Sequence, residues 1–161
     1  MIRPPIILDP SLTGNATHKL FIRIKPGIPN FAAVLAQEVV EWRFLRFWGL
    51  LTMLPAIALF WFIPWPLVLP ALVFGHVIPT LIPAVRRKME LIGHAVEVEV
   101  AVRLYGQDRA AYRLLEAAAL SRHYKQFKGY SVERLDALLI GHGERAAKWV
   151  GRHAEWIGGR V

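Results

Sequence analysis

Apolar residues are concentrated in one stretch of the chain, residues 47–85, which contains no Asp, Glu, Lys or Arg. Pro64 and Pro66 lie near its middle, and two prolines this close together do not fit inside one helix. We therefore expect a helical hairpin with limbs at 44–63 and 67–85. Each limb has the length, roughly 20 residues, that a helix needs to cross the hydrocarbon core of a bilayer.

The flanks of this hairpin favour contact with a membrane. Aromatic side chains near the limb ends match the aromatic belt of membrane proteins, and basic residues at both outer ends predict that both termini are cytoplasmic. The side chains expected at the membrane or another apolar interface are Trp48, Phe60, Trp61, Trp65 and Phe74. Those expected to contact an anionic surface are Arg43, Arg46, Arg86, Arg87 and Lys88.

A second interpretation places the same hairpin inside protein. Pro70, Pro79 and Pro83 divide the second limb into short pieces. At membrane depth, the free backbone groups of such pieces would need other protein around them. The hairpin would then be buried in a domain core or between subunits, and the sequence leaves both interpretations open.

Before the hairpin, the pattern predicts an irregular arm, a strand and a helix. Residues 1–18 are rich in proline and turn residues, which predicts the irregular arm. Apolar and polar residues alternate at 19–25, as they do in a strand. The apolar period then becomes helical, and we expect a helix that starts after Asn30 and ends near Gly49.

After the hairpin, the pattern is helical again. Residues 86–105 predict a helix that ends at Gly106, although the alternation at 94–102 leaves a strand as an alternative. Asp108 is the predicted cap of a further helix, which ends near Gln126. The apolar positions of that helix, expected to face the core, are Ala111, Leu114, Leu115, Ala118 and Ala119.

The last helical region starts at Ser131 and is expected to be interrupted at 141–143 by two glycines. Together these elements predict a mainly α protein, a helical bundle with a long apolar helical hairpin and one short N-terminal strand. We expect a single domain, 1–161. Its parts are the arm at 1–18, the strand and first helix at 19–49, the apolar hairpin at 50–85 and a basic helical part at 86–161.

Composition adds an electrostatic preference. The net charge is +8 and the pI is about 10.3, which favours anionic partners such as lipid head groups or an acidic protein face. Nucleic acid is not expected, because the basic run at 122–130 is typical of a solvated helix end. The chain has no cysteine, which excludes disulfides and thiolate ligands. Its first residues lack the pattern of a signal peptide, which predicts synthesis in a cytoplasm.

Candidate chemistry lies on both sides of the hairpin. Glu38 falls on the apolar face of its helix, where a carboxylate is costly unless it is paired or bound to a metal. On the helix after the hairpin, Glu90, His94 and Glu97 follow at i, i+4 and i+7, which places them on one face. The plainer alternative is a charge network that pairs these acids with the arginines flanking the hairpin.

The order of strand (LFIRIKPG), helix (NFAAVLAQEVVEW), apolar linker and helix (RRKMELIGHAVEVEV) over residues 19–130 resembles the small zincin-type metallopeptidase-like proteins of phage genomes. In that family the first helix carries H-E-x-x-H, in which two histidines bind zinc and the glutamate activates water. A glutamate on a later helix completes the ligands. The resemblance implies that Glu38 holds the catalytic position and Glu90 that of the distal ligand.

This chain departs from that motif at both histidines, where it has Gln37 and Glu41. The departure implies that zinc hydrolysis of the usual kind is lost, since carboxylate-rich sets suit harder ions than zinc. We expect no cofactor, and the alternative is a divalent metal. The candidate metal ligands are Glu41, Glu90, His94 and Glu97, with Glu38 as the candidate catalytic base. Paired helical carboxylates also resemble di-iron or di-manganese bundles, which however use Glu-x-x-His on two helices.

The expected function is that of a membrane-associating, non-catalytic structural or interaction protein of phage-like type, such as a virion or assembly component. Its partners would be a membrane or a larger protein assembly, or further copies of itself. The first alternative is a metal-dependent hydrolase with Glu38 as general base. The second is an assembly protein whose apolar hairpin is buried between subunits, with a soluble or virion-associated location.

Overall fold

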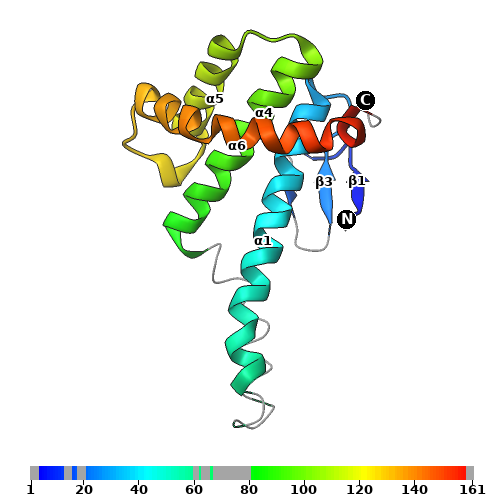
Figure 1. Cartoon of the computed structure of the whole chain (residues 1–161), viewed down its shortest axis with the longest axis vertical. Helices are drawn as coiled ribbons and strands as arrows, with labels where there is room; N and C mark the ends of the chain where they lie inside the picture. The colour runs from blue at the N-terminus through cyan, green and yellow to red at the C-terminus, as the bar shows by residue number, and fades with distance from the viewer. Residues whose placement is uncertain are drawn as a thin grey trace.

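The computed structural model describes residues 4–12, 16–17, 21–59, 62, 66 and 81–158. Within these ranges the protein is mainly helical, and the expected helical bundle is confirmed (Figure 1). The long helices are α1 (Phe31–Leu59), α4 (Pro83–Tyr105), α5 (Arg109–His123) and α6 (Val132–Gly158), with a short 3-10 helix, η1 (Lys125–Phe127), between the last two.

A small sheet lies at the N-terminal side of the bundle. It consists of β1 (Ile6–Leu8), β2 (Ala16–Thr17) and β3 (Ile22–Ile24), in the order β1-β3-β2, with β1 parallel and β2 antiparallel to β3. The expected strand is β3, whose two isoleucines are fully buried against α1.

The expectation of an irregular arm at 1–18 is wrong for β1 and β2. Two prolines come directly before β1 and do not interrupt it. A proline lacks only the backbone donor, so Pro5 still accepts a hydrogen bond from the backbone N–H of Ile22, at 2.9 Å. Asp9, just after β1, forms an ion pair with Arg23 of β3.

Helix α1 is longer than expected. It starts after Asn30, whose carbonyl accepts from the backbone N–H groups of Ala33 and Val34, but it continues past Gly49 and Pro55 to Leu59. A single glycine costs a helix only about 1 kcal/mol, so it does not stop a helix whose other residues favour it. Figure 1 shows the C-terminal half of α1 extending away from the other helices.

The apolar hairpin is therefore described only in its first limb, which is the end of α1. The turn at 64–66, apart from Pro66, and residues 67–80 lie outside the described residues. So do four of the predicted interface aromatics, Phe60, Trp61, Trp65 and Phe74. Among the helices in the described ranges, none combines the length and apolarity needed to cross a membrane.

Helix α4 is the central element of the bundle. It starts with Pro83 at its first turn and ends at Gly106, which has φ 65° and is therefore in the left-handed conformation that favours glycine. Residues 94–102 are helical, so the alternative of a strand is wrong there. The alternation does not produce a strand because α4 is enclosed by α1, α5 and α6, which bury both its apolar and its polar faces.

Helices α5 and α6 both pack on α4 and on each other. Asp108 caps α5 as expected, because its side chain accepts from the backbone N–H of Ala111 at 2.8 Å. The expected core face of α5 is wrong, since Leu114 and Leu115 are exposed while Ala117 and Leu120 are buried.

Helix α6 is continuous through 141–143, where we expected an interruption. The two glycines there have open space around them. Apolar residues before and after them lie on one buried face, so the packing of that face outweighs the low helix propensity of glycine. The buried residues of this face are Leu135, Leu139, Ala146, Val150 and Ile157.

Candidate metal centre

The site lies where α1 and α4 run side by side. Gly93 allows the two helices to come unusually close, since a Cβ atom at this position would lie 2.9 Å from Oε1 of Glu41 and 3.0 Å from Cγ of Gln37. The contact brings the predicted residues of α1 next to those of α4. We call the resulting buried group the Glu/His cluster, and its members are Glu38, Glu41, Glu90, His94, Glu97 and Glu116.

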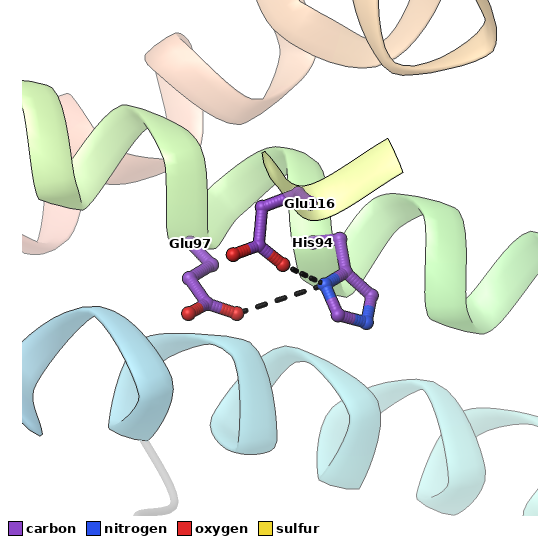
Figure 2. A group of neighbouring side chains, drawn as sticks. All are labelled: His94, Glu97 and Glu116. Carbon is purple, nitrogen blue, oxygen red and sulfur yellow. Dashed lines mark hydrogen bonds and ion pairs between the residues drawn. The ribbon is translucent and has the colours of Figure 1, made fainter. Parts of the chain in front are cut away.

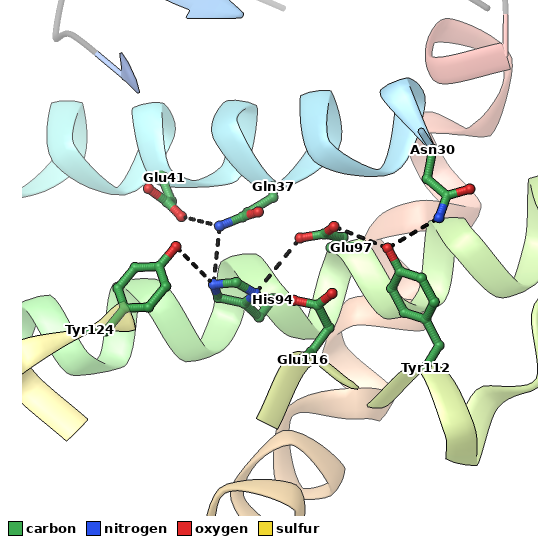
Figure 3. A network of polar contacts seen from close by, with 8 residues as sticks. All are labelled: Asn30, Gln37, Glu41, His94, Glu97, Tyr112, Glu116 and Tyr124. Carbon is green, nitrogen blue, oxygen red and sulfur yellow. Dashed lines mark hydrogen bonds and ion pairs between the residues drawn. The ribbon is translucent and has the colours of Figure 1, made fainter. Parts of the chain in front are cut away.

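His94 is the hub of the cluster (Figure 3). Its Nδ1 lies 2.6 Å from Oε2 of Glu116 on α5 and 3.7 Å from Oε2 of Glu97. Its Nε2 lies 3.2 Å from the hydroxyl of Tyr124 and 3.3 Å from Nε2 of Gln37. A proton on Nδ1 would be donated to Glu116, and Nε2 would then accept from the tyrosine or the amide.

The environment of His94 acts on its pKa in two opposed directions. Burial lowers the pKa, while the hydrogen bond to Glu116 and the negative charges of Glu116, Glu97 and Glu90 raise it, and the net effect is a raised pKa. The protonated, positively charged imidazole is therefore favoured more than in a free histidine.

Glu97 is positioned by two successive hydrogen bonds, which involve Tyr112 at the start of α5 and Asn30 just before α1. The hydroxyl of Tyr112 donates to Oε1 of Glu97 at 3.2 Å, and the side-chain amide of Asn30 donates to the same hydroxyl at 3.3 Å. Burial, followed by the charge of Glu116, raises the pKa of Glu97 to about 7.

Glu38 and Glu41 are the members of the cluster that lie on α1. Burial and the charges of Glu90 and Glu97 raise the pKa of Glu38 to about 8. Burial, with the charges of Glu90 and Glu38, also raises the pKa of Glu41 well above its usual value, although the Gln37 amide donates to its Oε1 at 2.9 Å. The local positive charge does not compensate the burial of these two carboxylates, so their protonated forms are favoured.

Glu90 has polar partners on its own helix and in η1. Its Oε1 accepts from the amide of Gln126 at 3.3 Å and lies 3.7 Å from Nε of Arg86. Burial still raises its pKa, against the lowering effects of His94 and Arg86. The contact with Arg86 is the one that the charge-network alternative predicted for a flanking arginine.

Three members of the cluster have the geometry of a metal site. One ligand atom from each of His94, Glu97 and Glu116 can be chosen so that all lie within 4.8 Å of one another (Figure 2). One imidazole nitrogen and two carboxylates form a ligand set that suits iron(II) or manganese(II), whereas zinc is often bound by thiolates, which are absent here. The donors present therefore fit a hard or borderline divalent ion.

Sequence reasoning missed Glu116, Tyr112 and Tyr124. Glu116 is the only acid in α5, between leucines and alanines, and this was a usable signal because such an acid is costly on an apolar face. The signal was lost because the inward face of α5 was assigned to Leu114 and Leu115. The two tyrosines carried no signal, since aromatic residues in helices are most often part of the core.

The flanking basic residues divide between the bundle and solvent. Arg43 lies against α6, with its guanidinium 5.6 Å from the ring centre of Trp149 and 3.0 Å from Nε2 of His153. Arg46 stacks on Trp42 at 4.8 Å. Arg86 and Lys88 are exposed and Arg87 is half-buried. Trp48 is half-buried, with its ring centre 6.1 Å from that of Phe44 and 6.2 Å from that of Phe47.

Comparison of the chain with protein-family models, with curated proteins and with solved structures gives no match.

Proposed function

We propose that this protein binds a divalent transition metal, of the iron(II) or manganese(II) class, in the Glu/His cluster. The observation that carries the proposal is the convergence of five glutamates and one histidine from three helices in the interior of a small bundle. Burial of that many acids in one place destabilises a fold unless positive charge accompanies them.

The raised pKa values support a metal in place of a simple charge network. In a network of matched ion pairs, each acid would have a lowered pKa, whereas Glu38, Glu41, Glu90 and Glu97 all have raised ones. A divalent cation reverses this situation, because it binds the deprotonated carboxylates and displaces their protons.

His94, Glu97 and Glu116 would supply the primary ligands. Glu38, Glu41 and Glu90 adjoin them and would either complete the coordination or hold a second ion, as paired carboxylates do in helical bundles. Tyr112 and Tyr124 would orient Glu97 and His94 through the hydrogen bonds that they already make.

The test is metal binding by the chelator-treated protein, measured calorimetrically with manganese(II) and, without oxygen, with iron(II). We expect saturable binding at one or two ions per chain, with proton release that is seen as a dependence on the ionisation enthalpy of the buffer. Glu97→Gln and Glu116→Gln should each weaken binding about tenfold or more. Glu155→Gln, which changes an exposed acid of α6, is the matched control. Absence of binding to the folded protein, or equal binding by all variants, would overturn the proposal.

A hydrolase is the catalytic form of this proposal. Glu38 holds the position of the catalytic base in the metallopeptidase-like pattern, and a pKa of about 8 suits a group that exchanges protons near neutral pH. The metal would supply a polarised water, and Glu38 would take its proton. If Glu38 is the base and not a ligand, Glu38→Gln should keep the metal and abolish peptide hydrolysis, while hydrolysis that survives this change would remove Glu38 from the role.

The exposed end of α1 supports a second function, attachment to an apolar surface. Phe47, Leu50 and Leu54 follow at i, i+3 and i+7 on one helix face and are 63%, 59% and 58% exposed. A face of this kind, beyond the bundle, is typical of a membrane or protein contact. The membrane is the partner that we propose, because basic residues lie at the start of this segment.

Flotation with liposomes tests this attachment. Leu50→Ser with Leu54→Ser should reduce flotation, whereas Leu115→Ser, which changes an equally exposed leucine of α5, should not. If the protein instead forms a large oligomer without detergent and the same double variant disperses it, the face is an assembly contact between copies. A monomer that does not float would contradict both.

A further inference from the structure

A cavity lies on the other side of the α1–α4 contact from the Glu/His cluster. Its volume is about 330 Å³, and it is lined by α1, α4 and α6. Ile92 and Val96 of α4 contribute to it, and each lies two positions from His94, which is about 200° away around a helix. The cavity and the cluster are therefore separate sites.

The floor of this cavity is apolar. Val40 of α1, the two α4 side chains Ile92 and Val96, and Trp149 of α6 form it. The ring of Trp149 is held in place by neighbours on α6 and α1, because it stacks on His153 at 4.3 Å and the guanidinium of Arg43 lies 5.6 Å from its centre. Such a floor favours a hydrocarbon group, and the volume falls within the range of about 300–1,000 Å³ that is usual for small-molecule sites.

The rim of the cavity carries positive charge. Arg145, Lys148 and Arg152 of α6 line it and are exposed, and none of the described residues that line it is acidic. Burial, followed by the positive charges of Arg145 and Lys88, lowers the pKa of His142 on the same rim. Lys88 therefore adds to the positive charge near the cavity. A rim with charge of one sign favours an anionic group.

We propose that this cavity binds an amphipathic anion, with its hydrocarbon chain on the Val40–Trp149 floor and its carboxylate or phosphate at Arg145, Lys148 and Arg152. An apolar floor next to a cationic rim fits both parts of such a molecule, whereas a neutral lipid would leave the rim without a partner. The anion has two sources, a free fatty acid or the head group of an anionic phospholipid. The proposal goes beyond metal binding and does not depend on it.

The first arm of the test uses a fluorescent fatty acid, 11-(dansylamino)undecanoic acid, below its micellar concentration. We expect saturable binding to the full chain, displaced by laurate but not by dodecanol, which has the same chain without the charge. Arg145→Gln with Arg152→Gln should weaken binding about tenfold or more, because two charge-assisted contacts are lost. Arg122→Gln, which changes an exposed arginine of α5, is the matched control.

The second arm compares vesicles of phosphatidylglycerol with vesicles of phosphatidylcholine. Preference for phosphatidylglycerol that the same double variant removes identifies the head group as the source, and binding of the fatty acid alone identifies the free acid. No binding in either arm, or binding that the double variant and Arg122→Gln change equally, would overturn the proposal. Manganese(II) affinity should be the same in all these variants, so a failure here leaves the metal proposal unaffected.

Discussion

His94 of α4 and Glu116 of α5 are joined by a contact of 2.6 Å between Nδ1 and Oε2. Both side chains lie almost entirely out of solvent, with 5% and 13% of their side-chain surface exposed. A contact of this length between an imidazole and a carboxylate is a charge-assisted hydrogen bond, which is stronger than a neutral one. It makes α5 a part of the site as well as a cover for α4.

Glu116→Gln is expected to lower the pKa of His94. The hydrogen bond and the charge of Glu116 both raise that pKa, whereas burial lowers it. A neutral amide in place of the carboxylate removes the charge, so the effect of burial is less opposed. A lower pKa of His94 in the variant, followed by NMR titration of the imidazole in metal-free protein, would agree with this. Glu155→Gln should leave the titration as it is, and an unchanged His94 in Glu116→Gln would show that the contact does not control its protonation.

Without metal, stability is expected to fall as the pH rises. Folding raises the pKa of Glu97 from 4.5 to about 7 and that of Glu38 from 4.5 to about 8. At a pH between the ordinary and the raised value of each group, the folded state holds a proton that the unfolded chain has released. The raised pKa of His94 acts in the same direction, because its contribution is lost as the pH rises through the folded value.

Glu97 alone corresponds to on the order of 3 kcal/mol of unfolding free energy between its ordinary and its raised pKa. Urea denaturation in the presence of a chelator, from about pH 5 to about pH 8, would measure the decline. Glu97→Gln should flatten it, since the amide does not titrate. Stability that instead rises with pH over this range would contradict the assigned direction of these shifts.

Gly93→Ala is expected to disturb the contact of α1 with α4. The added methyl would lie 2.9 Å from Oε1 of Glu41 and 3.0 Å from Cγ of Gln37, so both side chains must move in a buried region. A loss of about 1–3 kcal/mol in thermal or urea unfolding is the usual cost of such overpacking.

Gly141→Ala is the matched control for this change, because Gly141 lies within a helix and has open space around it. There the substitution should raise stability by about 0.5–1 kcal/mol through helix propensity. If both substitutions stabilise the protein, the two helices are not as close as Gly93 implies.

Asp108→Ala should destabilise α5, and with it the end of the bundle that supplies Glu116 and Tyr112. The carboxylate of Asp108 accepts from the backbone N–H of Ala111, and the loss of such a cap costs about 1 kcal/mol. Asp108→Asn should keep most of the stability, since its carbonyl oxygen can accept the same bond. Equal losses in the two variants would show that negative charge, rather than the cap, is what counts.

Most of the helices, and part of the site, could be predicted from the sequence. The helical period, the cap at Asp108 and the stop at Gly106 are local signals, and each corresponds to what the structure has. The positions of Glu38 on an apolar face, and of Glu90, His94 and Glu97 on one face of the next helix, likewise follow from helical spacing.

Local signals were wrong where packing outweighs them. Helix α6 passes the glycines at 141 and 143 because its buried apolar face continues on both sides of them, and α1 passes Gly49 because a single glycine costs a helix only about 1 kcal/mol. The arm before β3 joins a sheet, because strand pairing depends on a partner distant in sequence. The inward face of α5 was misassigned, since the sequence contains two apolar faces and only the neighbouring helix selects one.

The sequence by itself determined which residues share a helix face, and so which acids of α1 and of α4 lie together. Only the tertiary structure decided that the two faces meet, that Gly93 lets them come close, and that Glu116 and the tyrosines complete the group. The physical reason is that helical period is a property of a few consecutive residues, whereas a buried ionisable cluster depends on the distances and dielectric surroundings that three packed helices create.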